Sequence, residues 1–288
     1  MFKALIPLWI AFGSILSGCP YKNDKELKKQ YSIQIDKIGQ LPEYVLESSG
    51  LAFFPPNTFF THPDSGNDPI LIQFQLREDK IENVKEIKIA NTLNKDWEEL
   101  TRDDQGNMYL GDFGNNANLR KDLVIYVIDT SFELKSTLHF EYPDQKEFPP
   151  TDKDELNFDC EAFFWMKDHL YFFSKNRRYP YTKIYQMNLE TNSIKLIDSL
   201  LLKSPITGAD VRNDYKEAVL LTYGKIFFID ISHTTDVPKF THGYCQKFKN
   251  SGQSEAITYI ADNELIISNE KGKIYRLRRK GYSSLETQ

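Results

Sequence analysis

The chain has 288 residues, of which 40% are hydrophobic and 14% aromatic, and its formal net charge is −5 at pH 7. This length can bury one sizeable core, and the negative charge gives no basis for nucleic-acid binding, which depends on a basic surface. The 16 Tyr and 20 Phe favour β-structure, because aromatic side chains pack well on pleated sheets. We therefore expect an all-β domain with no nucleic-acid partner.

The N-terminal residues resemble a bacterial export signal. Lys3 supplies a positive charge, residues 4–15 form an apolar run too short for a stable membrane span, and Leu16-Ser17-Gly18-Cys19 follows. This ending resembles the lipobox, in which a signal peptidase cuts before the cysteine and the cysteine is lipidated. The resemblance implies a signal peptide at 1–18 and a lipid anchor at Cys19. An ordinary secretory signal with a chance cysteine is the alternative.

The next segment, residues 19–30, mixes lysines with acidic residues and predicts a hydrophilic tether between the membrane and the domain. Pro20 stands where many inner-membrane lipoproteins have an aspartate, so the resemblance favours the outer membrane and leaves its periplasmic or surface face open.

Two further cysteines, Cys160 and Cys245, lie in the expected domain. Export permits a disulfide between them. We expect Cys160 on an innermost strand and Cys245 on an outermost one, so two buried free thiols are favoured instead.

A repeat extends over most of the chain. Each copy has an apolar segment, a turn and a second apolar segment that ends in polar residues, and such a repeat indicates one recurring supersecondary unit. The copies are anchored, at intervals of 46 to 63 residues, at Ser49, Glu98, Glu161, Ala209 and Glu255.

Four short strands can be assigned to most copies. The expected third strands are 70–76, 123–128, 183–189, 225–231 and 273–277. The expected fourth strands are 84–90, 136–142, 193–200 and 239–245. The last copy has too few residues left for a fourth strand, whereas the segment 31–35 is unassigned at the start.

These strands predict a five-bladed β-propeller over residues 31–288, in which the N-terminal strand completes the last blade and closes the ring. A six-bladed propeller is the alternative, with a degenerate blade in residues 143–158. The Pro-rich, charged composition of that segment favours a surface loop.

A ring of polar residues is expected where the innermost strands begin. Ser49, Glu98, Glu161 and Glu255 belong to this ring, and Ala209 interrupts it. Two carboxylates about 5 Å apart repel by roughly 3 kcal/mol at an effective dielectric constant near 20, and a bound cation removes this cost. Oxygen ligands without His or Cys indicate a hard ion such as Ca²⁺. The alternative is that each glutamate caps its own turn and binds no metal.

This succession of Ser and Glu at strand starts resembles the calcium-activated nucleotidases (apyrases), five-bladed propellers with Ca²⁺ in the central tunnel. The resemblance covers the blade pattern along most of the mature chain and implies that Ser49, Glu98, Glu161 and Glu255 hold calcium. Ala209 departs from the hydroxyl that the family pattern expects, and leaves its own carbonyl or Thr207 in that role. This departure affects catalysis more than metal binding.

Three short phrases, Asp96-Trp97-Glu98, Asp159-Cys160-Glu161-Ala162 and Ser254-Glu255-Ala256, also resemble uncharacterised Bacteroidetes-type propeller lipoproteins and phytase-like esterase domains. Those families imply phosphoester or ester substrates.

A second polar ring is expected about fourteen residues after the anchors, because antiparallel neighbours bring the end of the second strand to the same face. Its members could bind phosphate oxygens, a sugar or the surroundings of a metal. The alternative is that they form polar turns. The candidate ligand-binding residues are His62, Asp112, Asn115, Asn116, Arg120, Lys175, Arg177, Tyr223 and Asn269.

Three classes of function remain open at this stage: a ligand- or partner-binding propeller, a metal-dependent phosphoester or ester hydrolase, and a structural surface protein. No pair of nucleophile and base can be recognised. Ser254 matches a nucleophile elbow only superficially, because a strand rather than a helix is expected to follow it. The sequence therefore favours binding over catalysis.

Overall fold

The computed structural model describes residues 19, 31–45, 47–175, 177, 180–248 and 252–281. The predicted signal peptide and the predicted tether beyond Cys19 lie outside these residues. Within the described segments, no helix has the length and apolarity needed to cross a bilayer.

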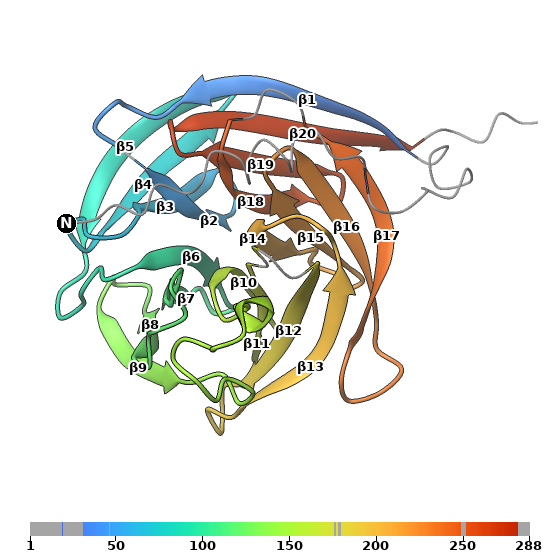
Figure 1. Ribbon diagram of the computed structural model, residues 1–288. Helices are drawn as coiled ribbons and strands as arrows, with labels where there is room; N and C mark the ends of the chain where they lie inside the picture. The colour runs from blue at the N-terminus through green and yellow to red at the C-terminus, as the bar shows by residue number, and fades with distance from the viewer. Residues whose placement is uncertain are drawn as a thin grey trace, which may run out of the picture.

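Five four-stranded antiparallel sheets stand around a common axis (Figure 1), so the predicted five-bladed β-propeller is confirmed. Blade 1 contains β2 (Ser48–Phe54), β3 (Thr58–Pro63), β4 (Ile70–Arg77) and β5 (Lys80–Lys88). Blade 2 contains β6 (Trp97–Arg102), β7 (Met108–Asp112), β8 (Leu123–Ile128) and β9 (Leu134–Phe140). Blade 3 contains β10 (Cys160–Met166), β11 (His169–Ser174), β12 (Tyr181–Asn188) and β13 (Ile194–Leu201).

Blade 4 contains β14 (Ile206–Val211), β15 (Glu217–Thr222), β16 (Lys225–Ser232) and β17 (Lys239–Lys247). Blade 5 contains β18 (Ser254–Ala261), β19 (Glu264–Asn269), β20 (Lys273–Gly281) and the N-terminal strand β1 (Tyr31–Gln40). The innermost strands are β2, β6, β10, β14 and β18.

Strand β1 completes blade 5, as the missing fourth strand predicted. It pairs antiparallel with β20 from Tyr31 opposite Gly281 to Gln40 opposite Lys273. Ile33 on this strand packs against the core between blades 4 and 5. The pairing covers the outer edge of β20, which would otherwise present unpaired backbone groups.

Burial along each blade explains which segments form its strands. All seven residues of β10 are buried, whereas β5 on the outside of blade 1 alternates between half-buried and exposed positions. Aromatic rings fill the space between neighbouring blades, as expected. Phe113 of blade 2 meets Phe163 and Phe172 of blade 3 edge-on, with ring centroids 5.1 and 5.8 Å apart. Each such pair contributes about 1 kcal/mol beyond the area it buries.

The long connection between β9 and β10 is a surface loop, so the six-bladed alternative is wrong. Its regular structure is a single 3₁₀ turn, η2 (Lys153–Glu155), whose residues are exposed. The charged and Pro-rich segment provides no alternating apolar residues that could pack in a sheet.

The cysteines confirm one prediction and correct another. Cys160 is a fully buried free thiol on β10, and burial raises its pKa to about 12. Cys245 lies on the outermost strand β17, as expected, but it forms a disulfide with Cys19 rather than remaining a free thiol. The two Cα atoms are 6.0 Å apart, although 226 residues separate them in sequence. A sulfur in a disulfide cannot also carry the thioether of a lipid anchor, so the disulfide and lipidation are alternative states of Cys19.

We expect that removing β1 destabilises the whole ring. A chain that begins at residue 41 should unfold at a temperature lower by about 10 °C than one that begins at residue 31, since several kcal/mol of edge pairing are lost. Both chains lack Cys19, so the disulfide does not differ between them. Thermal unfolding followed by circular dichroism measures the difference, and equal midpoints would contradict the closing role of β1.

Candidate functional site

The innermost strands β2, β6, β10, β14 and β18 all begin at the same end of the axis, which we call the top face. The pairing register of each shifts near its start. In four blades the shift skips one residue, and such a bulge redirects a side chain out of the regular alternation. The skipped residues are Glu98, Glu161, Thr207 and Glu255.

This register corrects the predicted anchor of blade 4. Ala209 pairs regularly with Leu220, and the position equivalent to the glutamates is Thr207. The predicted anchor lies two residues too far along the chain, because the bulge of blade 4 has no glutamate that the sequence pattern could identify. Blade 4 therefore does place a hydroxyl at this position.

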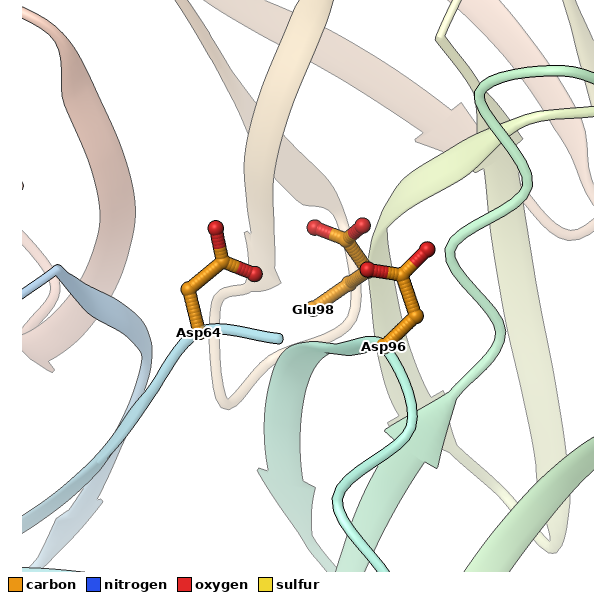
Figure 2. A group of neighbouring side chains, drawn as sticks. All are labelled: Asp64, Asp96 and Glu98. Carbon is orange, nitrogen blue, oxygen red and sulfur yellow. The ribbon is translucent and has the colours of Figure 1, made fainter. Parts of the chain in front are cut away.

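A cluster of carboxylates lies on the top face between blades 1, 2 and 3. Oxygens of Asp64, Asp96 and Glu98 lie within 4.8 Å of one another, and Figure 2 shows the three side chains around a common space. Glu98, Asp159 and Glu161 meet the same limit, so Glu98 belongs to both groups. We call these five residues the acidic cluster.

Burial and mutual repulsion disfavour the charged form of the cluster. Glu98 is 6% exposed, and its pKa is raised well above the ordinary value, first by burial and then by the charges of Glu161 and Asp64. The pKa of Asp96 is raised to about 7, by burial and then by Asp159 and Asp64. At neutral pH the cluster therefore needs protons or a cation to offset its charge.

Two cations already neutralise one side of the cluster. Lys175, which is 1% exposed, forms an ion pair with Glu161. An Nη2 atom of Arg177 lies 2.9 Å from Asp159 Oδ2 and 3.2 Å from Glu161 Oε1. Neither cation forms an ion pair with Asp96 or Glu98.

The structure thus brings together only part of the predicted metal ring. Glu98 and Glu161 lie in the cluster, whereas Glu255 joins neither group of ligating oxygens. The pKa of Glu255 is raised by burial, an effect that Lys175 opposes. Ser49 Oγ donates a 2.7 Å hydrogen bond to the carbonyl oxygen of Glu98 and so ties blade 1 to blade 2.

Gly114 leaves space for the carboxylates of the acidic cluster. The backbone N–H of Gly114 donates to the carbonyl oxygen of Asp96 at 3.1 Å. A Cβ atom at Gly114 would collide with Glu98 Oε1 and Asp96 Oδ2. The connection after β7 therefore closes over the carboxylates only because residue 114 has no side chain.

Several candidates from the second ring position the cluster. Asp112 accepts the backbone N–H of Asp96 at 3.1 Å and pairs with Arg120 at 2.9 Å. The backbone N–H of Asn115 donates to Asp159 Oδ1 at 2.8 Å, and the Asn116 side chain accepts from Arg177.

The other second-ring candidates have structural surroundings. His62 is fully buried against Trp97, and burial lowers its pKa to about 4. Tyr223 accepts a 3.5 Å hydrogen bond from Lys175 Nζ. Asn269 Oδ1 caps a turn by accepting the N–H groups of residues 271 and 273 at 3.1 and 2.9 Å.

Sequence reasoning missed Asp64, Asp96, Asp159 and Gly114. A signal existed for two of them, because Asp96 and Asp159 each stand two residues before a ring glutamate, in Asp96-Trp97-Glu98 and Asp159-Cys160-Glu161. Asp64 and Gly114 come from turns after second strands, where the sequence shows only polar composition.

The axis is closed at mid-height by a further carboxylate. Glu99 Oε1 accepts the backbone N–H groups of Leu51 and Leu100 at 3.1 and 3.0 Å, and Oε2 accepts that of Ala209 at 3.3 Å. Glu99 is 1% exposed, so solvent reaches it from neither end. Its pKa is raised well above the ordinary value because burial outweighs these hydrogen bonds.

The fold and the top-face carboxylates define a five-bladed β-propeller with an acidic cluster on its top face. No protein-family model matches the chain, and no curated protein sequence is significantly similar. Among solved structures, the glutaminyl cyclase of Myxococcus xanthus is similar with a TM-score of 0.53 at 11% identity, over 86% of this chain and 97% of that one. The PQQ-bound aldose sugar dehydrogenase of Streptomyces coelicolor gives 0.53 at 8% identity, over 86% and 99%. Both neighbours are enzymes, and the similarity concerns the fold alone.

We expect Asp96 to make the cation-free protein less stable as the pH rises. Its pKa is raised from 3.8 to about 7, so its protonated form stabilises the fold fully below pH 3.8, and this contribution is lost as the pH rises through about 7. The loss amounts to at most about 4 kcal/mol. Urea unfolding in chelator between pH 5 and pH 8 should show a flatter dependence for Asp96→Asn.

The matched control for this experiment is Asp68→Asn, which removes an exposed carboxylate from the connection that also holds Asp64. It should keep the slope of the unchanged protein. Equal slopes for all three proteins would contradict the raised pKa of Asp96.

Proposed function

We propose that the acidic cluster binds one divalent cation, most favourably Ca²⁺, and that the protein recognises a small ligand or a partner on this face. The observation that supports the proposal is that two sets of three neighbouring carboxylates share Glu98. The proposed site keeps Glu98 and Glu161 from the predicted one, and Asp64, Asp96 and Asp159 take the place of Ser49 and Glu255 as ligands. Glu161 is also held by Lys175.

The donor set supports a hard cation. Every candidate ligand is a carboxylate oxygen, and Ca²⁺ takes six to eight oxygen ligands from carboxylates, carbonyls and water. Imidazole and thiolate ligands, which favour zinc, are lacking in the cluster, and the nearby His62 is fully buried. Gly114 leaves the space between Asp96 and Glu98 open, as a bound ion requires.

Binding is favoured over catalysis because the two cations that contact the acidic cluster, Lys175 and Arg177, are already paired with its carboxylates. Lys175 and Arg177 both contact Glu161, so neither stands ready to receive a phosphate without first giving up an ion pair. A bound cation would relieve that arrangement by attracting Glu161, and would supply open positions for ligand oxygens.

A metal-dependent phosphoester or ester hydrolase is the second candidate, and one observation favours it. Asp96 has a pKa of about 7 and lies within the cluster. A carboxylate with such a pKa can accept a proton from an attacking water near neutral pH. A screen of nucleotides and generic phosphoesters, with Ca²⁺ and with chelator, tests this role. Turnover with Ca²⁺ that chelator abolishes would favour the hydrolase.

Calcium should stabilise the protein, because it binds the folded state alone. At a free concentration 100 times the Kd, the gain is about 2.7 kcal/mol. Calorimetry should show this gain in the unchanged protein and in Asp68→Asn, and little of it in Glu98→Gln. Glu255→Gln should retain most of the gain, because Glu255 lies outside both carboxylate groups. Equal melting temperatures with Ca²⁺ and with chelator would mean that the cluster holds protons instead of a metal.

We also propose that the protein is exported to the cell envelope and anchored through Cys19, with the outer membrane favoured. The lipobox-like residues 16–19 support this location. A disulfide between residues 226 apart requires a folded domain, whereas lipidation at the membrane acts on the N-terminus during export. The lipid would therefore reach the sulfur first and leave Cys245 as a thiol.

Metabolic labelling with a fatty-acid probe tests the anchor. We expect label on the unchanged protein and none on Cys19→Ala. Peptide mapping without reductant provides the opposite outcome, since a Cys19–Cys245 peptide together with absence of label would show that the protein is exported without an anchor.

A further inference from the structure

A second cavity opens at the other end of the axis, which we call the bottom face. Its volume is about 270 Å³, and all five innermost strands or the turns after them contribute to its walls. Residues that bear on its chemistry are Thr101, Arg102, Trp165, Asp210, Tyr215 and Tyr259. Leu51, Leu100 and Ala209, which bind the Glu99 carboxylate, also line the cavity, so Glu99 stands between it and the top face.

Arg102 is unusual among the described arginines. The half-buried or buried arginines at 120, 177, 212, 276, 278 and 279 each pair with an aspartate or a glutamate. Arg102 is half-buried and forms no ion pair within the described residues: Nε donates to the carbonyl oxygen of Phe53 at 2.6 Å, Nη1 donates to that of Asp103 at 3.1 Å, and the guanidinium lies over the Phe54 ring, 5.4 Å from its centroid. Its Nη2 atom has no partner among the described residues. The Asp210 carboxylate interacts electrostatically with Arg102 but does not pair with it, so the guanidinium keeps a donor free for an anionic ligand.

The acidic residues of the cavity are already engaged. Both oxygens of Asp210 accept hydrogen bonds, from the N–H of Val211, the hydroxyl of Thr258 and the N–H of Tyr259, each at 2.8 Å. Asp104 accepts the Tyr215 hydroxyl at 3.1 Å. The acceptors of the cavity are therefore used within the protein.

Donors, in contrast, remain available. The indole N–H of Trp165 has no partner among the described residues. Thr101 Oγ1 accepts the backbone N–H of Trp165 at 3.3 Å, which leaves the hydroxyl hydrogen of Thr101 free to donate. The rings of Trp165 and Tyr215 lie edge-to-face with centroids 6.4 Å apart and provide an apolar wall.

We propose that the bottom-face cavity binds a small organic acid through its carboxylate. The carboxylate accepts hydrogen bonds from Arg102 Nη2 and from the Thr101 hydroxyl, and the apolar part of the acid packs against Trp165 and Tyr215. The cavity has one guanidinium beside the carboxylates of Asp104 and Asp210, so it accepts no more than a single negative charge, which restricts the ligand to a monocarboxylate. The cavity is smaller than the roughly 300 to 1,000 Å³ typical of drug-sized ligands, so the acid is small. This site is independent of the cation proposed for the top face.

Benzoate and benzamide are matched probes, because the amide keeps the ring and loses the charge. Titration calorimetry and ligand-detected NMR in chelator should show benzoate binding at least tenfold more tightly than benzamide. Arg102→Gln should weaken benzoate at least tenfold, while Arg77→Gln, which changes an exposed arginine on blade 1, should leave it unchanged. Adding Ca²⁺ should have no effect, which separates this site from the top face.

Arg102 also ties β6 to β2, so its replacement could unfold the protein. Thr101→Val provides a second variant that keeps this contact, and we expect a three- to tenfold loss of benzoate affinity with circular dichroism unchanged. The proposal is overturned if neither benzoate nor any of a set of small aliphatic carboxylates binds, if benzamide binds as tightly as benzoate, or if folded Arg102→Gln and Thr101→Val retain full affinity.

Discussion

The carboxylate of Glu99 holds the centre of this propeller together. An innermost strand has a neighbour on one side only, so the backbone groups on its other edge face the axis without a strand to pair with. Glu99 satisfies three of them at once, in β2, β6 and β14. An unsatisfied buried N–H costs about 1 to 3 kcal/mol, so one side chain compensates three blades that are distant in sequence.

Other side chains form hydrogen bonds between blades nearer the two ends of the propeller axis. Ser49 and Thr207 donate to carbonyl oxygens of the following blades at 2.7 and 2.6 Å, and Asp210 of blade 4 accepts from Thr258 and Tyr259 of blade 5. Because these residues are used to join blades, they are not available as ligands. The chemistry of each end therefore rests on the groups that remain: the acidic cluster on the top face, and Arg102 on the bottom face.

The sequence predicted the fold well because its evidence is periodic. A pattern repeated at intervals of 46 to 63 residues indicated the number of blades, and the missing strand after residue 277 indicated that residues near 31 close the ring. It predicted the site less well for local reasons. A bulge changes the residue that faces the axis, so the sequence pattern predicts Ala209 at the position that Thr207 occupies. Ion pairing also changes the role of a residue, as Lys175 does for Glu161. Neither effect, nor the Cys19–Cys245 disulfide across 226 residues, can be read from spacing along one chain.

The position of β1 also constrains the order of events during synthesis. Strands within blades 1 to 4 pair with close neighbours in the chain, so these hairpins can form as the chain emerges. Strand β1 is made first, yet its partner β20 is made last. At about 5 to 20 residues per second, β1 waits on the order of tens of seconds. Throughout that interval the nascent domain has an unpaired strand, and its ring closes only when β20 has been made. A truncated chain that stops before β20 therefore remains open however well its other blades have formed, so ring closure reports that the whole domain has been made.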